Sequence, residues 1–260
     1  MVKRKVKTRL DQLVVARGLA ESRQRAQAMI LAGQILVNNQ KAAKAGVLVA
    51  LDAAIELIGE PLKYSSRAGL KLEGALRDFR VNVAGRVCLD AGCSTGGFTD
   101  CLLQHGASRV FAVDVNTAQL DWKLRQDPRV FPIECNARFL EPADIAEAPD
   151  VVTVDLSFIS VAKVLPALAA LARPGADFLV LVKPQFELDR KDVGRGGIVR
   201  DPLLHERAIE RIRVAAELAR LSVVAVAPSR LPGAEGNQEY FLHARLAQRA
   251  SGISPGQQVE

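Results

Sequence analysis

A glycine-rich turn is the part of this sequence best suited to chemistry. The segment "VCLDAGCSTGGFTDCLL" (87–103) has the pattern of a strand, a turn containing Gly92, Gly96 and Gly97, and a helix. In an open α/β sheet, such a turn lets the backbone approach a ligand, and the helix that follows offers free N–H groups. The segment therefore predicts a ligand site.

A carboxylate at the end of the next apolar run indicates what the ligand contains. The run "RVFAVDV" (109–115) carries Asp114, which lies 24 residues after Asp90. An acidic residue at about this distance from the glycine turn commonly binds ribose hydroxyls. We therefore expect a ligand that contains a ribose.

The spacing of the glycines separates three ribose-containing ligands. Gly92, Gly96 and Gly97 do not match the dinucleotide pattern G-x-G-x-x-G, and no lysine follows them as a nucleoside-triphosphate loop requires. Asp90 at the mouth of the turn would repel a phosphate and attract a cation. S-adenosylmethionine, a nucleoside with an ammonium and a sulfonium, fits best; the alternative is a tight turn whose glycines serve packing alone. The expected cofactor-binding residues are Asp90, Gly92, Cys93, Ser94, Thr95, Gly96, Gly97, Asp114, Asn136 and Asp155.

Two charged residues end later apolar runs. Asp155 follows "DVVTV" and Lys183 follows "FLVLV", and strand ends of this kind converge on the ligand crevice of an open sheet. A lysine amine there can accept a proton or stabilise an oxyanion. Both actions suit methylation of a hydroxyl group.

The cysteines and histidines predict neither a metal site nor a cysteine nucleophile. The four cysteines form no C-x-x-C pair and the three histidines are scattered, so no metal is expected. Methylation at carbon five of a pyrimidine would use a cysteine nucleophile. Cys93, however, lies in the cofactor turn and no Pro-Cys loop follows the fourth run, so we interpret it as a wall of the cofactor site.

The order of apolar runs predicts an α/β domain with a mostly parallel sheet. Short apolar runs alternate with amphipathic stretches from residue 71 onward. The expected strands are 86–90, 109–114, 130–135, 150–155, 177–183, 222–227 and 239–245. The glycine-containing segment 191–201, "KDVGRGGIVRD", is expected to be a cationic substrate loop.

The N-terminal part has the pattern of a separate small unit. Leu10, Leu13 and Val14 have helical spacing and Gly18 can end that helix; Ser22 can cap a second helix, in which Arg23 and Arg25 face outward. Strands are expected near 34–41, 47–51 and 54–58. We divide the chain into an N-terminal domain (1–60), a linker (61–70), an α/β domain (71–246) and a disordered tail (247–260).

The positive charge is concentrated in this N-terminal unit. The first 50 residues hold ten Lys or Arg and two acidic residues, whereas the whole chain carries only +6. A basic unit on a nearly neutral body is typical of a protein that binds a polyanion; the alternative is a solvated surface. The expected RNA-binding residues are Lys3, Arg4, Lys5, Lys7, Arg9, Arg23, Arg25, Lys41 and Lys44.

No apolar run has the length of a membrane helix, and no apolar core follows the basic N-terminus. We therefore expect a cytoplasmic protein without a membrane partner, and a monomer by default.

Six stretches carry a resemblance to a known family. They are "RLDQLVVARGLAESRQRAQAMILAGQILVN", "YSSRAGLKLEGAL", "CLDAGCSTGGFTDCLL", "VDLSFIS", "LVKPQFE" and "GNQEYF". In that order they resemble the TlyA-type (haemolysin A) ribosomal RNA 2′-O-methyltransferases, whose catalytic domain is similar to that of the FtsJ methyltransferases.

The resemblance implies a fold, a catalytic set and a substrate. The fold is a Rossmann-like S-adenosylmethionine-dependent methyltransferase domain preceded by a small α+β, αL-type RNA-binding domain. The catalytic tetrad would be Lys71, Asp155, Lys183 and Glu239. The substrate would be the ribose of a cytidine in ribosomal RNA, so that ribosomal subunits would be the partner.

Two other functions remain open. A non-catalytic RNA-binding or ribosome-assembly protein could keep a vestigial cofactor pocket, although the intact tetrad weighs against it. A membrane-lysing protein, as the name haemolysin suggests, would need an apolar span or a cationic amphipathic helix with an aromatic face, and neither is evident.

Overall fold

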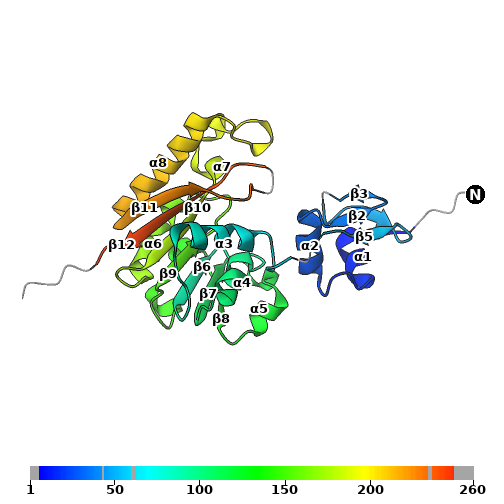
Figure 1. Cartoon of the computed structure of the whole chain (residues 1–260), viewed down its shortest axis with the longest axis horizontal. Helices are drawn as coiled ribbons and strands as arrows, with labels where there is room; N and C mark the ends of the chain where they lie inside the picture. The colour runs from blue at the N-terminus through cyan, green and yellow to red at the C-terminus, as the bar shows by residue number, and fades with distance from the viewer. Residues whose placement is uncertain (1–5, 43, 60–61, 234–235, 249–260) are drawn as a thin grey trace, which may run out of the picture.

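The computed structural model describes residues 6–42, 44–59, 62–233 and 236–248, which form two units (Figure 1). Lys3, Arg4, Lys5 and the expected tail from residue 249 onward lie outside the described residues. None of the helices in the described part of the chain is long and apolar enough to cross a membrane.

The N-terminal unit is a small α+β fold. Its core contains Leu10, Leu13, Ala26, Ile30 and Ile35, from both helices and one strand. One sheet has the order β3-β2-β5, and β1 pairs with β4. The elements are β1 Lys7–Arg9, α1 Leu10–Ala16, α2 Arg23–Leu31, β2 Ile35–Val37, β3 Gln40–Lys41, β4 Leu48–Ala50 and β5 Ile55–Leu57.

Local signals in the sequence fix the ends of these elements. Gly18 adopts a φ of 70° after α1, a conformation that glycine favours. The Ser22 hydroxyl accepts a hydrogen bond from the Arg25 amide at 3.1 Å and caps α2. Asn38 and Asn39 take positive φ between β2 and β3. The expected helices and strands of this unit are confirmed.

The C-terminal unit is built on a seven-stranded sheet with the order β11-β12-β10-β9-β6-β7-β8. β12 runs antiparallel to both of its neighbours, and the five strands from β10 to β8 are parallel. Each expected run forms a strand, so the mostly parallel sheet is confirmed. The strands are β6 Val87–Ala91, β7 Arg109–Asp114, β8 Val130–Glu134, β9 Val151–Val154, β10 Asp177–Val182, β11 Leu221–Pro228 and β12 Tyr240–Leu246.

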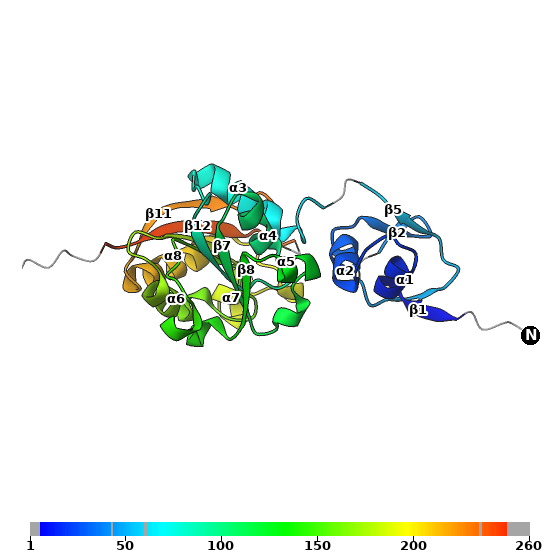
Figure 2. The same cartoon turned by 90° about the horizontal axis from the view of Figure 1, so that it is seen from below.

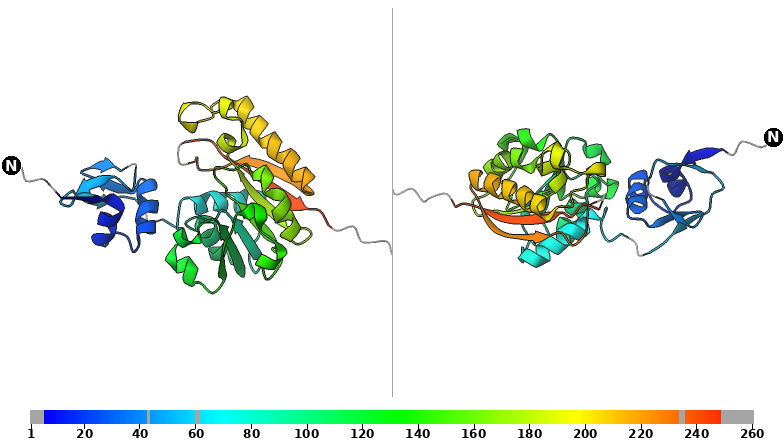
Figure 3. Two further views of the ribbon diagram at one scale, coloured as in Figure 1. Left: turned by 180° about the vertical axis from the view of Figure 1, so that it is seen from behind. Right: turned by 90° about the horizontal axis from the view of Figure 1, so that it is seen from above.

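Helices cover both faces of this sheet (Figures 2 and 3). On one face α3 (Ala68–Phe79), α4 (Gly97–Gln104) and α5 (Trp122–Gln126) contribute to a buried apolar cluster. On the other face α6 (Leu165–Leu171) and α8 (Pro202–Leu218) contribute to a second one. The four-residue helix α7 (Pro184–Glu187) directly follows β10 and Lys183. Short 3₁₀ turns lie in the connections: η1 Thr117–Gln119, η2 Ala137–Phe139, η3 Pro142–Asp144, η4 Val161–Lys163, η5 Arg190–Asp192 and η6 Arg195–Gly197.

Part of the expected linker packs into the C-terminal unit. Tyr64 is buried in the same apolar cluster as Leu72, and α3 begins at Ala68 rather than after residue 70. The ring of Tyr64 lies so close to Gly69 that a Cβ there would be 2.4 Å from it. Ser, Arg and Gly in this segment have the composition of a loop, and only the tertiary contact shows why it is ordered.

The expectation that Arg25 faces outward is wrong. Its guanidinium donates hydrogen bonds to the Leu62 and Tyr64 carbonyl oxygens at 2.9 and 2.8 Å. These two backbone carbonyl oxygens accept hydrogen bonds that the guanidinium would otherwise donate to water or to a phosphate. Arg25 therefore joins α2 to the segment that leads into α3.

Candidate active site

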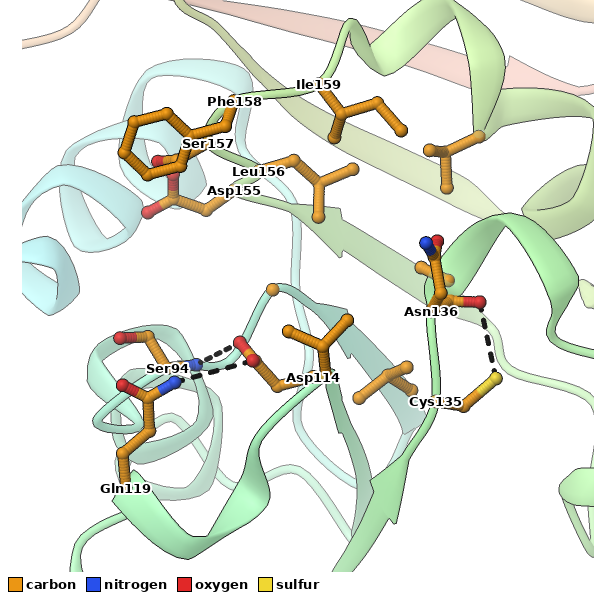
Figure 4. Close-up of a pocket in the computed structure, with 15 residues that line it drawn as sticks. Ser94, Asp114, Gln119, Cys135, Asn136, Asp155, Leu156, Ser157, Phe158 and Ile159 are labelled. Carbon is orange, nitrogen blue, oxygen red and sulfur yellow. Dashed lines mark hydrogen bonds between the residues drawn. The ribbon is translucent and has the colours of Figure 1, made fainter.

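A cavity of about 520 Å³ opens where β6, β7 and β9 end (Figure 4). Among the expected cofactor residues, Gly92, Ser94, Asp114, Asn136 and Asp155 line it. Parallel strands bring their carboxyl ends to one edge of the sheet, and ligands of open α/β folds bind there. The cavity therefore lies where the sequence predicts a ligand.

The carboxylate of Asp114 is held at the rim of this cavity. One oxygen accepts a hydrogen bond from the Ser94 amide at 2.9 Å. The other accepts from the Asn116 amide at 3.1 Å and from the Gln119 side chain at 3.4 Å. Figure 4 shows Ser94 and Gln119 converging on Asp114. A carboxylate oriented in this way is suited to accept hydrogen bonds from two neighbouring hydroxyls.

The three glycines of the turn permit close packing around the cavity. A Cβ on Gly92 would lie 2.4 Å from the Asp155 carbonyl oxygen, and one on Gly97 would lie 2.3 Å from the Ser66 hydroxyl. Gly96 has a φ of 93° and packs against Leu124 in the same manner. The glycines thus serve packing, and Gly92 also exposes its backbone to the cavity.

A second cavity of about 210 Å³ shares Gly92, Ser94, Asp155 and Ser157 with the first. It extends toward Lys183, and its wall includes the expected residues Cys93, Thr95 and Gly97 together with Ser66, Ala68 and Phe98. The shared residues make the two cavities one site with two lobes. An elongated ligand could place one end at Asp114 and the other near Lys183.

Asp90, one of the expected cofactor residues, does not reach either cavity with its side chain. Its side chain is fully buried and lines neither cavity. Its carboxylate accepts hydrogen bonds from the hydroxyls of Thr99 at 2.7 Å and Thr153 at 3.0 Å. Burial raises the pKa of Asp90 to about 7, against the opposing effect of these two bonds. Asp90 therefore joins β6, the first turn of α4 and β9 beneath the site.

Two of the four residues of the expected tetrad, Asp155 and Lys183, meet in the second cavity, and Asp155 also lines the first. The Lys183 amine lies 2.6 Å from an Asp155 carboxylate oxygen and donates a hydrogen bond to the Ser157 hydroxyl at 3.0 Å. Both charged side chains are mostly buried, at 12% and 16% exposure. A buried ion pair with a further hydroxyl partner holds the amine in one direction.

The other two form a second ion pair. The Lys71 amine on α3 donates to a Glu239 carboxylate oxygen at 2.5 Å, and Glu239 is almost fully buried. Gly233 leaves room for this carboxylate, since a Cβ there would lie 2.5 Å from it. Neither residue lines the two cavities, but Ala68, one helical turn before Lys71, does.

Cys93 has the character of a wall residue. Its side chain is 3% exposed, and burial raises the pKa of its thiol above the ordinary value. Because the thiolate is the nucleophilic form of cysteine, a thiol kept neutral by burial is poorly suited to covalent catalysis.

Analysis of the sequence missed an exposed aromatic residue beside the cavity. Phe158 is 92% exposed, adopts a φ of 67° and stands at the cavity mouth in Figure 4. Its ring lies 5.3 Å from that of Phe186. An exposed phenylalanine with positive φ is uncommon, and such strain concentrates at functional sites.

The basic residues of the N-terminal unit differ in how they are held. Lys7, Lys41 and Lys44 are exposed. Arg9 and Arg23 are each about half exposed and pair with the buried carboxylate of Asp11 at 2.8 and 3.4 Å. The side chain of Asp11 therefore orients two of the predicted RNA-binding arginines.

Comparison with known proteins agrees with this geometry. Residues 64–246 match the model of FtsJ-like methyltransferases and residues 8–55 match the S4 domain. The 16S/23S rRNA (cytidine-2′-O)-methyltransferase TlyA of Mycobacterium tuberculosis is 46% identical over 92% of this chain and 90% of its own length. The protein named Hemolysin A of Brachyspira hyodysenteriae is 42% identical over 90% of this chain and 98% of its own.

The chain belongs to the FtsJ-like methyltransferase family. It is therefore an S-adenosylmethionine-dependent methyltransferase with an S4 domain. A solved structure of a protein described as a hemolysin from Streptococcus thermophilus covers 97% of this chain and 93% of its own, with a TM-score of 0.74 and 40% identity. The predicted fold, with an αL-type (S4) unit before a Rossmann-like methyltransferase domain, is confirmed.

Asp90 generates a prediction about stability and pH. Its folded-state pKa of about 7 lies above the reference of 3.8, so the folded protein binds the extra proton and loses stability as pH rises through this range. Each unit of difference corresponds to about 1.4 kcal/mol. Asp90→Asn cannot titrate, so the free energy of unfolding of the variant should gain on that of the wild type between about pH 4 and 7 and then level off.

Denaturant unfolding of both proteins across this pH range measures the difference. Asp189→Asn, at an exposed position in the same domain, is the control and should follow the wild type. A difference between Asp90→Asn and wild type that stays constant with pH would contradict the assignment.

Proposed function

We propose that this methyltransferase transfers a methyl group to the 2′-hydroxyl of a cytidine in ribosomal RNA. The observation that carries the proposal is the Lys183–Asp155 ion pair, in which both residues line the second cavity and Asp155 also lines the first. The names of the curated TlyA relatives support the same reaction and substrate. An RNA substrate of this kind would place the protein in the cytoplasm.

The residues of the site fit S-adenosylmethionine. Asp114 would accept hydrogen bonds from the ribose hydroxyls, and Asn136 lines the same cavity. The turn from Cys93 to Gly97 and the start of α4 would hold the other end of the cofactor. When bound, S-adenosylmethionine supplies an electrophilic methyl group.

The chain itself contributes positioning and a charged amine. The neutral form of the Lys183 amine, at the end of β10, can take the proton of a ribose hydroxyl, whereas the charged form can stabilise the oxygen as it becomes anionic. Asp155 and Ser157 hold the amine in place. Lys71 and Glu239 would form the second pair of the tetrad and orient the nucleotide or Lys183.

Lys183→Ala should keep cofactor binding and lose methyl transfer by about 100-fold or more, because it removes the group that manages charge on the oxygen. The purified protein would be incubated with labelled S-adenosylmethionine and unmodified ribosomal subunits. Large and small subunits would be used in separate reactions. The RNA is then digested and 2′-O-methylcytidine is measured by mass spectrometry. Calorimetry measures cofactor binding, and Lys163→Ala, an exposed lysine of the same domain, is the control.

An active Lys183→Ala enzyme would remove the catalytic assignment. No transfer by the wild type to either subunit would remove the proposed reaction on ribosomal RNA and leave RNA binding by the N-terminal unit as the function to examine.

Phe158 would support the base of the target nucleotide. Aromatic side chains stack on splayed bases, and such a contact is worth about 1–3 kcal/mol by alanine substitution. Phe158→Ala should therefore raise KM for the RNA about 10-fold or more while cofactor affinity changes little, and Phe158→Trp should restore it. Phe139→Ala is the control, because Phe139 is also exposed, at 65%, and lines neither cavity. Equal KM values for Phe158→Ala and wild type would argue against stacking.

The N-terminal unit would bind RNA through phosphates. Affinity should fall steeply with salt, and Lys41→Gln or Lys44→Gln should each reduce the slope of log K against log[salt] by about 1. Filter binding at several salt concentrations gives the slope. Arg213→Gln on α8 is the control and should leave it unchanged. A flat salt response of the wild type would show that the basic residues form only a solvated surface.

A further inference from the structure

Two segments of the site are joined by a series of contacts, and the proposed reaction assigns no role to the innermost of them. The segments are 155–161, which follows β9, and 183–187, which follows β10; the two strands are parallel neighbours. Asp155 and Ser157 contact Lys183, and the Phe158 ring contacts the Phe186 ring. We call these contacts, with the one described next, the brace.

The innermost contact of the brace is made by Glu187. One carboxylate oxygen accepts a hydrogen bond from the Ser160 hydroxyl at 2.5 Å, and the other accepts from the Val161 amide at 2.8 Å. Glu187 is 1% exposed and Ser160 is 8% exposed. Arg211 on α8 fixes the same residue by donating to the Glu187 backbone carbonyl at 2.9 Å. The contact is therefore buried and held from two sides.

Burying a carboxylate is costly, and burial indeed raises the pKa of Glu187. An apolar side chain would fill the same place without that cost. The bonds to Ser160 and Val161 have a different effect, because they specify where the chain after Phe158 must run. Phe158, whose positive φ is strained, lies in the chain between Ser157, which contacts Lys183, and Ser160, which contacts Glu187.

We propose that Glu187 is a positioning residue of the methyl-transfer site, which fixes segment 155–161 against segment 183–187 and thereby sets Asp155, Ser157 and Phe158 relative to Lys183. It does not touch the cavities itself. The inference rests on the proposed function for its kinetic consequence. Its structural part, the anchoring of segment 155–161, is independent of the RNA.

The kinetic test compares four changes at the brace with a matched control. Glu187→Ala should lower kcat on the order of 10- to 100-fold at saturating cofactor, because small misplacements of catalytic groups are costly. Glu187→Gln should stay within about threefold of wild type, since its amide oxygen can accept from Val161 and its NH₂ can donate to the Ser160 oxygen. Ser160→Ala alone keeps the Val161 bond and should lose less than Glu187→Ala. Combined with Glu187→Gln, it still keeps the Val161 bond through the amide oxygen and should likewise lose less than Glu187→Ala.

Asp177→Asn is the control for loss of a buried carboxylate. Asp177 begins the same strand, β10, and accepts hydrogen bonds from Arg86, His243 and Arg245 at the opposite edge of the sheet. The Asp177→Asn variant should lower the thermal midpoint of unfolding at least as much as Glu187→Ala does, and its kcat should stay near that of the wild type. Equal kcat losses in the two variants would overturn the proposal, as would a kcat of Glu187→Ala within about twofold of wild type.

Hydrogen–deuterium exchange tests the brace without RNA. In Glu187→Ala the Val161 amide loses its acceptor, so peptides that cover 156–161 should exchange faster, while Asp177→Asn should leave them unchanged. Unchanged exchange at 156–161 in Glu187→Ala would overturn the inference. If the wild type transfers no methyl group to RNA but exchange changes as expected, the proposed function fails and the brace stands.

Discussion

The register of β9 between β6 and β10 is the constraint on which the site depends. Asp90 lies opposite Thr153, and Thr153 lies opposite Leu179, so β6 and β9 end at the same level and β10 continues to Val182 beside them. The Asp155 amide continues this pairing by donating to the Ala91 carbonyl at 2.9 Å. A shift by one residue would turn Asp155 away from Lys183 and move the Asp155 carbonyl from its contact with Gly92. The cofactor turn and the catalytic pair are thus set by the same ladder of backbone bonds.

Two buried carboxylates secure this arrangement from below. Asp90 takes hydroxyl donors from α4 and β9, and Glu187 takes a hydroxyl and an amide from the segment after β9. In each case burial raises the pKa, because desolvation disfavours the charged form of the carboxylate. Both have donors aimed at each oxygen, and a buried carboxylate needs such donors to be tolerated. The hydrogen bonds of Asp90 and Glu187 fix the relative positions of the elements that they join, which apolar packing alone specifies less closely.

Sequence reasoning found the residues whose position follows from a local rule. Asp155 and Lys183 end apolar runs, and the carboxyl ends of parallel strands meet. The same rule does not place the side chain of Asp90, because it does not say whether a side chain near a strand end points into the crevice or beneath the adjoining helix. Lys71 and Glu239 are 168 residues apart and form one ion pair. No local pattern carries a pairing at that separation, so only the resemblance to a family indicated them.

The number of charges in the N-terminal unit does not show which of its cations contact a polyanion. Composition treats all cations alike, whereas Arg25 holds the chain at Leu62 and Tyr64, and Arg9 and Arg23 share Asp11. The exposed side chains of Lys7, Lys41 and Lys44 remain available for direct contact with a phosphate. The field of the unit still acts over about a Debye length, so all its cations contribute to attraction. Long-range attraction can therefore be inferred from sequence, but the choice of contacting residues depends on which cations the fold already uses.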